Sequence, residues 1–238
     1  MRIYRTTSGP FSERPYYSVE EVEKICTDEL LKVGLLPKSP GPIRIDRFIE
    51  KKFKVNHRYE DLPEGVLGCT KFGSKGVEEI VVLRSLAEER NKLSERRINT
   101  TLAHEAGHGL LHAHLFAFGE QPRSLFGDSL DPIETKILCR KDTIEGIQNR
   151  KRIDYGGRWW EYQANLAIGG LLLPRQLVMI ILEQFLVEKG RLGSKVLDSV
   201  RKEEAMRKLV GVFDVNPSMA RIRIETIFPP DQDFQLTL

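Results

Sequence analysis

Two histidines and a glutamate in the segment HEAGH at 104–108 have the residue types and the spacing of a zinc site. Residues four apart project from the same face of a helix, so the imidazoles of His104 and His108 can reach one ion at about 2.1 Å. Glu105 follows the first histidine and points toward the open side of that ion. Its carboxylate can take a proton from the attacking water and pass it to the leaving amine. The pattern therefore predicts metal-assisted hydrolysis of a peptide bond, with Glu105 as the base.

A catalytic zinc needs a third protein ligand and one open position. His114 occupies the third-histidine position of the extended metzincin pattern, but Leu111 stands where that pattern has its turn glycine. The helix should therefore continue and carry His114 away from the ion. His112 lies one turn beyond the motif, rotated and too far along the axis for tight chelation. A glutamate from a following helix is the remaining solution, and Glu161, near the start of the helix expected at 158–173, is the best candidate.

Four segments taken together resemble the ImmA/IrrE family of metallopeptidases. They are DLPEGVLG at 61–68, TLAHEAGH at 101–108, EYQAN at 161–165 and LLLP at 171–174. The resemblance covers roughly residues 43–190 and is much more specific than HExxH alone. It implies one Zn²⁺ per chain with Glu161 as the third ligand, and Asn165 as a neighbour that orients the ligand shell. It also implies an endopeptidase whose substrate is a protein partner, such as a helix-turn-helix repressor in stress response or mobile-element control.

Peptide hydrolysis also needs a hydrogen-bond donor aimed at the developing oxyanion. The sequence leaves five candidates open: His112, His114, Tyr155, Arg158 and Tyr162. For each of them, ordinary packing or a surface position is the more frequent role.

The C-terminal residues 209–224 permit a function of a different class. Residues 213–220 have the character of the turn and the start of a recognition helix, and Arg221 and Arg223 follow them. The same residues suit a helical hairpin that packs on the catalytic body or holds a substrate. A net charge of +3, from 37 basic and 34 acidic side chains, argues against nucleic acid as a partner. A metal-sensing DNA-binding or protein-binding regulator without peptidase activity is kept as the alternative function.

Helical periodicity and turn residues predict the elements that must position the site. Helices are expected at 18–34, 46–53, 94–115, 158–173, 176–188, 196–210 and 217–227, and strands at 66–72, 79–83 and 137–139. The fold class is therefore α+β, in which a small antiparallel sheet packs on the HExxH helix and on a second metal-ligand helix. Additional helices are expected at both ends of the chain. Residues 120–158 are expected to form an excursion over the surface that serves as a functional loop.

Composition and the positions of the Pro- and Gly-rich segments predict a chain of three parts and its cellular location. The parts are an N-terminal helical segment and linker at 1–42, a metallopeptidase domain at 43–190 and a C-terminal helical region at 191–238. A hydrophobic content of 40% is enough for a core, and Cys26, Cys69 and Cys139 form neither a disulfide framework nor a CxxC pair. The charged N-terminus and the lack of an apolar run of about 20 residues disfavour secretion and membrane insertion. We therefore expect a cytoplasmic protein with no membrane partner.

Overall fold

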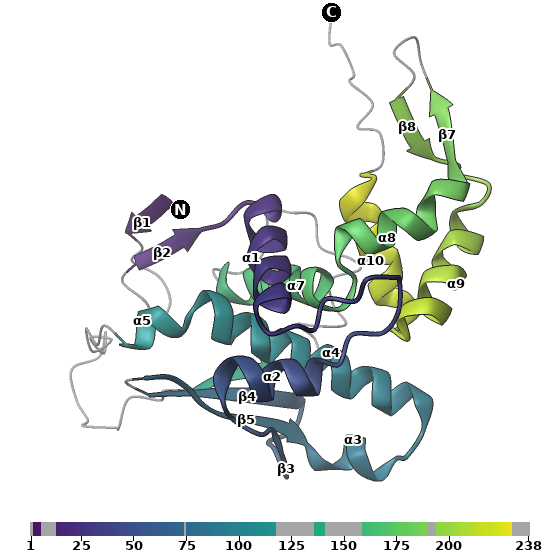
Figure 1. Cartoon of the computed structure of the whole chain (residues 1–238). Helices are drawn as coiled ribbons and strands as arrows, with labels where there is room; N and C mark the ends of the chain where they lie inside the picture. The colour runs from purple at the N-terminus through teal and green to yellow at the C-terminus, as the bar shows by residue number, and fades with distance from the viewer. Residues whose placement is uncertain are drawn as a thin grey trace, which may run out of the picture.

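The structure, a computed structural model, has the expected α+β class. It describes residues 2–5, 13–73, 75–117, 136–140, 159–189 and 194–229. Within these ranges Figure 1 shows a sheet at the base, the long helix α4 above it, and α7 with α1 above α4. The fold is therefore layered, and α4 is the middle layer.

The sheet consists of β3 (Arg58–Glu60), β4 (Val66–Gly73), β5 (Gly76–Leu83) and β6 (Lys136–Arg140), in the order β3-β5-β4-β6. β4 pairs antiparallel with β5 and with β6, which confirms the strands predicted at 66–72, 79–83 and 137–139. β3 was not predicted, and it runs parallel to β5, so the expectation of a purely antiparallel sheet is wrong at this edge. All three residues of β3 are exposed, which leaves no alternation of apolar and polar residues to reveal a strand.

Helices lie on the sheet and extend beyond it. They are α1 (Val19–Lys32), α2 (Ile45–Phe53), α3 (Arg84–Glu88), α4 (Lys92–Leu111), α5 (Ala113–Ala117), α7 (Trp159–Leu172), α8 (Arg175–Leu182), α9 (Lys202–Phe213) and α10 (Pro217–Ile227). Two hairpins project from this body: β1 (Arg2–Arg5) with β2 (Glu13–Tyr16), and β7 (Leu186–Lys189) with β8 (Ser194–Leu197). The helices predicted at 46–53, 158–173 and 217–227 agree with α2, α7 and α10 to within one residue.

The start and the end of α4 set the position of the HEAGH segment. The helix begins with a reciprocal cap, in which the Asn91 side chain accepts from the Ser94 N–H and the Ser94 hydroxyl accepts from the Asn91 N–H. It ends at His112, where the chain turns into α5, so the single helix predicted at 94–115 is divided in two. Because α4 contacts the sheet on one side and α7 on the other, even its polar central residues are buried.

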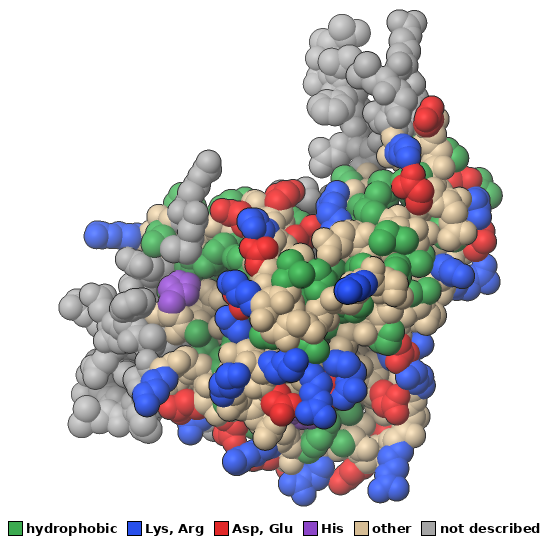
Figure 2. All heavy atoms as spheres, viewed as in Figure 1, with side chains coloured by type: hydrophobic (Ala, Val, Ile, Leu, Met, Phe, Trp, Pro, Cys, Tyr) green, Lys and Arg blue, Asp and Glu red, His purple; other side chains and the backbone are tan. Residues whose placement is uncertain are grey.

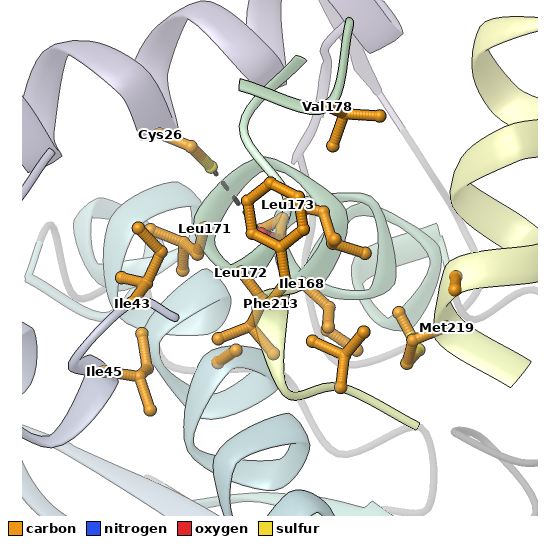
Figure 3. Packing of buried hydrophobic residues seen from close by; sticks show 14 of the residues in the cluster. Cys26, Ile43, Ile45, Ile168, Leu171, Leu172, Leu173, Val178, Phe213 and Met219 are labelled. Carbon is orange, nitrogen blue, oxygen red and sulfur yellow. Dashed lines mark hydrogen bonds between the residues drawn. The ribbon is translucent and has the colours of Figure 1, made fainter. Parts of the chain in front are cut away.

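Small residues let α4, α7 and α1 approach one another closely. A Cβ on Gly107 of α4 would lie 2.8 Å from Ala167 Cβ of α7, and a Cβ on Gly170 of α7 would lie 2.9 Å from Cys26 Cβ of α1. The Cys26 thiol donates to the Ala167 carbonyl oxygen at 3.8 Å, and a dashed line marks this bond at Cys26 in Figure 3. The lack of a side chain at Gly107 therefore admits a second helix against α4.

The predictions for residues 176–210 are wrong in two places. The helix predicted at 176–188 ends at Leu182, and the helix predicted at 196–210 begins only at Lys202. Between these residues lie a short 3-10 turn and the hairpin of β7 and β8. Val187 in this hairpin is exposed. The apolar residues of the hairpin therefore do not alternate between a buried and an exposed face, which is the pattern that would have predicted strands.

The C-terminal helices are joined to the N-terminal helix by a buried ion pair. Arg223 of α10 donates through Nη1 to Glu23 Oε1 of α1 at 2.6 Å and through Nε to the Leu173 carbonyl oxygen at 2.9 Å. Only 3% of Arg223 is exposed. Arg223 is therefore not available as the DNA contact that the alternative function would need, whereas the division of the chain into three parts stays a prediction.

The core and the surface have the character that the composition predicts. Ile168 and Leu172 of α7, Phe213 of α9 and Met219 of α10 belong to one buried cluster, part of which Figure 3 shows. Figure 2 shows Lys and Arg side chains interspersed with Asp and Glu over one face. Among the described residues no single helix is long and apolar enough to cross a membrane. Helices α7 and α8 reach the necessary length and apolar composition only when they are taken together across a 59° bend.

The close approach at Gly107 gives a first prediction. Gly107→Ala should lower the free energy of unfolding by about 1–3 kcal/mol, because the new methyl group meets Ala167 with no flexible side chain to move aside. Gly211→Ala in α9 is the matched control, since nothing lies within 4 Å of its Cβ position; it should raise stability by about 0.5–1 kcal/mol. Urea unfolding measures both, and equal effects of the two substitutions would contradict the proposed packing.

Candidate metal centre

Three side chains from α4 and α7 converge on one point. His104 Nε2 lies 3.0 Å from His108 Nε2 and 3.2 Å from Glu161 Oε2, and His108 Nε2 lies 3.6 Å from Glu161 Oε1. Ligand atoms placed about 2.1 Å from a tetrahedral ion are about 3.4 Å apart. The structure therefore contains a buried group of His104, His108 and Glu161 that can bind a metal ion.

The electrostatics of this group favour a cation. Glu161 is 4% exposed, and its Oε2 has no hydrogen-bond partner among the described residues. Burial works to lower the pKa of His104, but Cys139 and Glu161 raise it well above its ordinary value. Burial together with His104 and His112 lowers the pKa of His108 well below its ordinary value. A buried carboxylate costs several kcal/mol unless it is paired with positive charge, so a divalent ion fits these donors.

Asn165 determines which nitrogen of His104 faces His108 and Glu161. It lies one turn beyond Glu161 on α7, and its Oδ1 is 2.9 Å from His104 Nδ1. Because a carbonyl oxygen only accepts, Nδ1 carries a proton, and Nε2 is the nitrogen that faces Glu161 and His108. The contact fits the orienting role that the family resemblance implies for Asn165.

A chain of three hydrogen bonds determines which ring nitrogen of His108 faces His104 and Glu161. Gln163 Nε2 donates to the carbonyl oxygen of Pro15 in β2 at 2.7 Å, which turns Gln163 Oε1 toward His112 Nε2 at 3.0 Å. His112 therefore donates through Nε2, and its Nδ1 accepts from His108 Nδ1 at 2.9 Å. Burial lowers the pKa of His112 to about 3, which keeps this ring neutral. The Nε2 lone pair of His108 is thus left for the ion.

Glu105 lies beside the metal group, on the side of the sheet. Thr70 of β4 donates through Oγ1 to Glu105 Oε2 at 2.5 Å, while Oε1 has no partner among the described residues. Burial raises the pKa of Glu105 to about 8. Gly68 of β4 provides the room, because a Cβ there would lie 3.0 Å from Glu105 Oε1. One carboxylate oxygen is therefore held, and the other can accept a proton.

Of the other residues that the sequence offered as ligands or oxyanion donors, none that the structure describes is a member of the group of His104, His108 and Glu161. Both ring nitrogens of His112 are engaged in hydrogen bonds, so it serves neither as a ligand nor as an oxyanion donor. His114 lies on α5 and belongs to no group of candidate ligand atoms within the described ranges. Tyr162 is half-buried on α7. Tyr155 and Arg158, and the predicted excursion at 120–158 apart from β6, lie outside the described residues.

Three residues of the site were not predicted. Thr70 and Gln163 hold Glu105 and His112, and Cys139 of β6 forms a second group with His104 and Glu105, whose ligand atoms lie within 4.8 Å of one another. A single threonine, glutamine or cysteine has no spacing that reveals its partner. The one local signal was Gly68, because a glycine inside a strand marks a place where another group approaches closely.

Comparison of the chain with models of protein families and with curated protein sequences gave no match.

The hydrogen bonds behind His108 give a second prediction. His112→Phe keeps a ring of similar size but removes the acceptor for His108 Nδ1, so we expect metal affinity to fall about 10- to 100-fold. Competition with a chromophoric chelator measures the affinity. His57→Phe, which changes a histidine remote from the ligand group, is the control and should leave the affinity unchanged. An unchanged affinity in His112→Phe would show that this contact does not orient His108.

Proposed function

We propose that the chain is a zinc-dependent endopeptidase of the ImmA/IrrE type, with His104, His108 and Glu161 as the zinc ligands. The observation that carries the proposal is the convergence of one carboxylate from α7 on two imidazoles of α4, with Glu105 beside them. Catalytic zinc in peptidases is often held by two histidines and one glutamate, and its fourth coordination position is left open. The HExxH helix between the sheet and the second ligand helix supports the same class.

Each residue then has a defined role in peptide hydrolysis. His104, His108 and Glu161 would hold the zinc, which would polarise the scissile carbonyl and lower the pKa of the attacking water. Glu105 takes the proton of that water on Oε1, the oxygen that Thr70 leaves unengaged, and passes it to the nitrogen of the leaving amine. Asn165 and His112 keep the two imidazoles in the required tautomers.

The burial of the proposed centre restricts the kind of substrate that can reach it. His104, Glu105 and His108 are fully buried. A peptide therefore reaches Glu105 only after the segments that cover it have moved. Such a requirement favours a protein partner whose binding energy opens the site. A helix-turn-helix repressor in stress response or mobile-element control is the partner that the family resemblance supports.

The alternative of a metal-sensing DNA-binding regulator has lost part of its support. Of its two arginines, Arg223 is buried against Glu23, and only Arg221 is exposed. Helices α9 and α10 contact each other, and both contribute to the core. A protein-binding regulator without peptidase activity remains the competing class.

Replacing the proposed base separates these two classes. Glu105→Gln should retain about one zinc per chain but cleave its partner about 10²- to 10⁴-fold more slowly, because proton transfer is lost while the ligands remain. Zinc is measured by elemental analysis, and cleavage by mass spectrometry with a repressor encoded beside this gene as substrate. Glu95→Gln, an exposed change on the same helix, is the control and should leave both values unchanged. Equal cleavage by parent and Glu105→Gln would exclude the peptidase mechanism.

The third ligand has a test of its own. Glu161→Ala removes the carboxylate that bridges both imidazoles, and the protein should then retain much less than one zinc after dialysis against a weak chelator. Glu183→Ala, at an exposed position in the 3-10 turn after α8, should retain the same zinc as the parent. Full zinc retention in Glu161→Ala would show that the metal is bound in another way.

A further inference from the structure

The N-terminal hairpin of β1 and β2 has an outer face with two tyrosines. Tyr4 pairs with Arg14 and Ile3 with Pro15, and the side chains of paired residues share one face. Pro15 is buried, so its face is turned to the body of the molecule and the face of Tyr4 and Arg14 is turned outward. Tyr16, two residues after Arg14, lies on the same outer face, where its ring meets that of Tyr4 edge to face at a centroid distance of 6.3 Å.

The composition of the hairpin is that of a binding surface. Tyr4 is 50% exposed and Tyr16 is 45% exposed, although both carry a large ring that gains from burial. Arg5 and Arg14 are also exposed. Tyrosine and arginine are among the residue types that contribute most to binding energy at the centre of protein interfaces. The two strands contain three arginines and one glutamate, a net charge of +2, which favours a partner with acidic residues.

One edge of the hairpin is open to a further strand. Pro15 has no N–H group, so Ile3 and Pro15 cannot exchange two backbone hydrogen bonds, and the backbone polar groups of both residues point away from the opposite strand. The Pro15 carbonyl oxygen does so, since it accepts from Gln163 of α7 at 2.7 Å. The N–H and C=O groups of Ile3 therefore point out of the other edge, where no further strand pairs with β1 within the described ranges.

The anchored edge of the hairpin connects it to the proposed centre. Gln163 bonds both Pro15 and His112, and His112 bonds the candidate ligand His108. A partner that docks on the hairpin is therefore held on an element that is bonded to the centre. This continuity favours the protein substrate as the occupant.

We propose that β1 binds an acidic, extended segment of the protein substrate as a third strand, which packs on Tyr4 and is attracted by Arg5 and Arg14. The inference rests on the proposed function for the identity of the occupant and adds the surface that selects it. In strand addition the main-chain hydrogen bonds supply affinity and the side chains supply specificity. Nucleic acid is the less favoured occupant, because tight binding to phosphates takes several basic contacts and the two strands have a net charge of only +2.

Peptide binding tests this surface separately from hydrolysis. The full-length chain carries Glu105→Gln, so that a bound probe is not cleaved, and fluorescence anisotropy measures its affinity for three labelled peptides of equal length. The first peptide alternates Glu with Val, the second alternates Lys with Val, and the third is the acidic peptide methylated on every backbone nitrogen. The acidic peptide should bind at least about 10-fold more tightly than the other two, because one of these has the wrong charge and the other has no N–H donors.

Matched substitutions identify the hairpin as the place of binding. Tyr4→Ala should weaken binding of the acidic peptide about 5-fold or more, and Arg14→Glu should weaken it about 10-fold. Arg207→Glu makes the same charge reversal at an exposed position of α9, which Figure 1 shows on the other side of the molecule, and should leave the affinity unchanged.

Three outcomes overturn the proposal: no binding or equal binding of the three peptides, hairpin variants that bind as tightly as the parent, and tighter binding of single-stranded DNA than of the acidic peptide. The comparison of the three peptides needs no hairpin variant, so it decides the matter even where a variant fails to fold. Failure of the proposed function has a different result, equal cleavage of the partner by the parent and by Glu105→Gln, whatever the peptides bind.

Discussion

The contact between α4 and α7 is the constraint on which the candidate centre depends. Gly107 lies between the two histidines of α4, and its lack of a side chain lets Ala167 of α7 come close. At that separation Glu161 reaches the imidazoles of His104 and His108. Burying one carboxylate against two imidazoles is costly without a cation. The same packing that stabilises the core therefore creates a site that favours metal.

The hydrogen bonds behind the ligands connect this centre to the N-terminal hairpin. Every buried polar group must find a partner, and a bare histidine nitrogen directed at a metal leaves the other nitrogen to be satisfied. Asn165 serves His104, and the chain through His112 and Gln163 ends on the Pro15 carbonyl of β2. An element outside the predicted peptidase domain thus takes part in orienting His108.

The sheet contributes the second half of the centre. Thr70 holds one oxygen of Glu105, Gly68 leaves space for the other, and Cys139 lies next to both the base and His104. Ligand side chains from α7 and base-side residues from the sheet meet only because α4 is placed between these two layers. The middle layer, α4, therefore carries the two candidate histidine ligands and the proposed base. Its side chains contact α7 on one side and the sheet on the other.

The sequence by itself determined the features that depend on near neighbours along the chain. The i, i+4 spacing places His104 and His108 on one helix face, and Ser18 with Glu21, three residues apart, forms a capping box at the start of α1. The tertiary structure alone decided the pairings of distant residues. Gln163 bonds Pro15 across 148 positions and Arg223 bonds Glu23 across 200, while the hairpin of β7 and β8 replaced predicted helix. Such contacts have no local spacing, because their partners meet only when the layers pack.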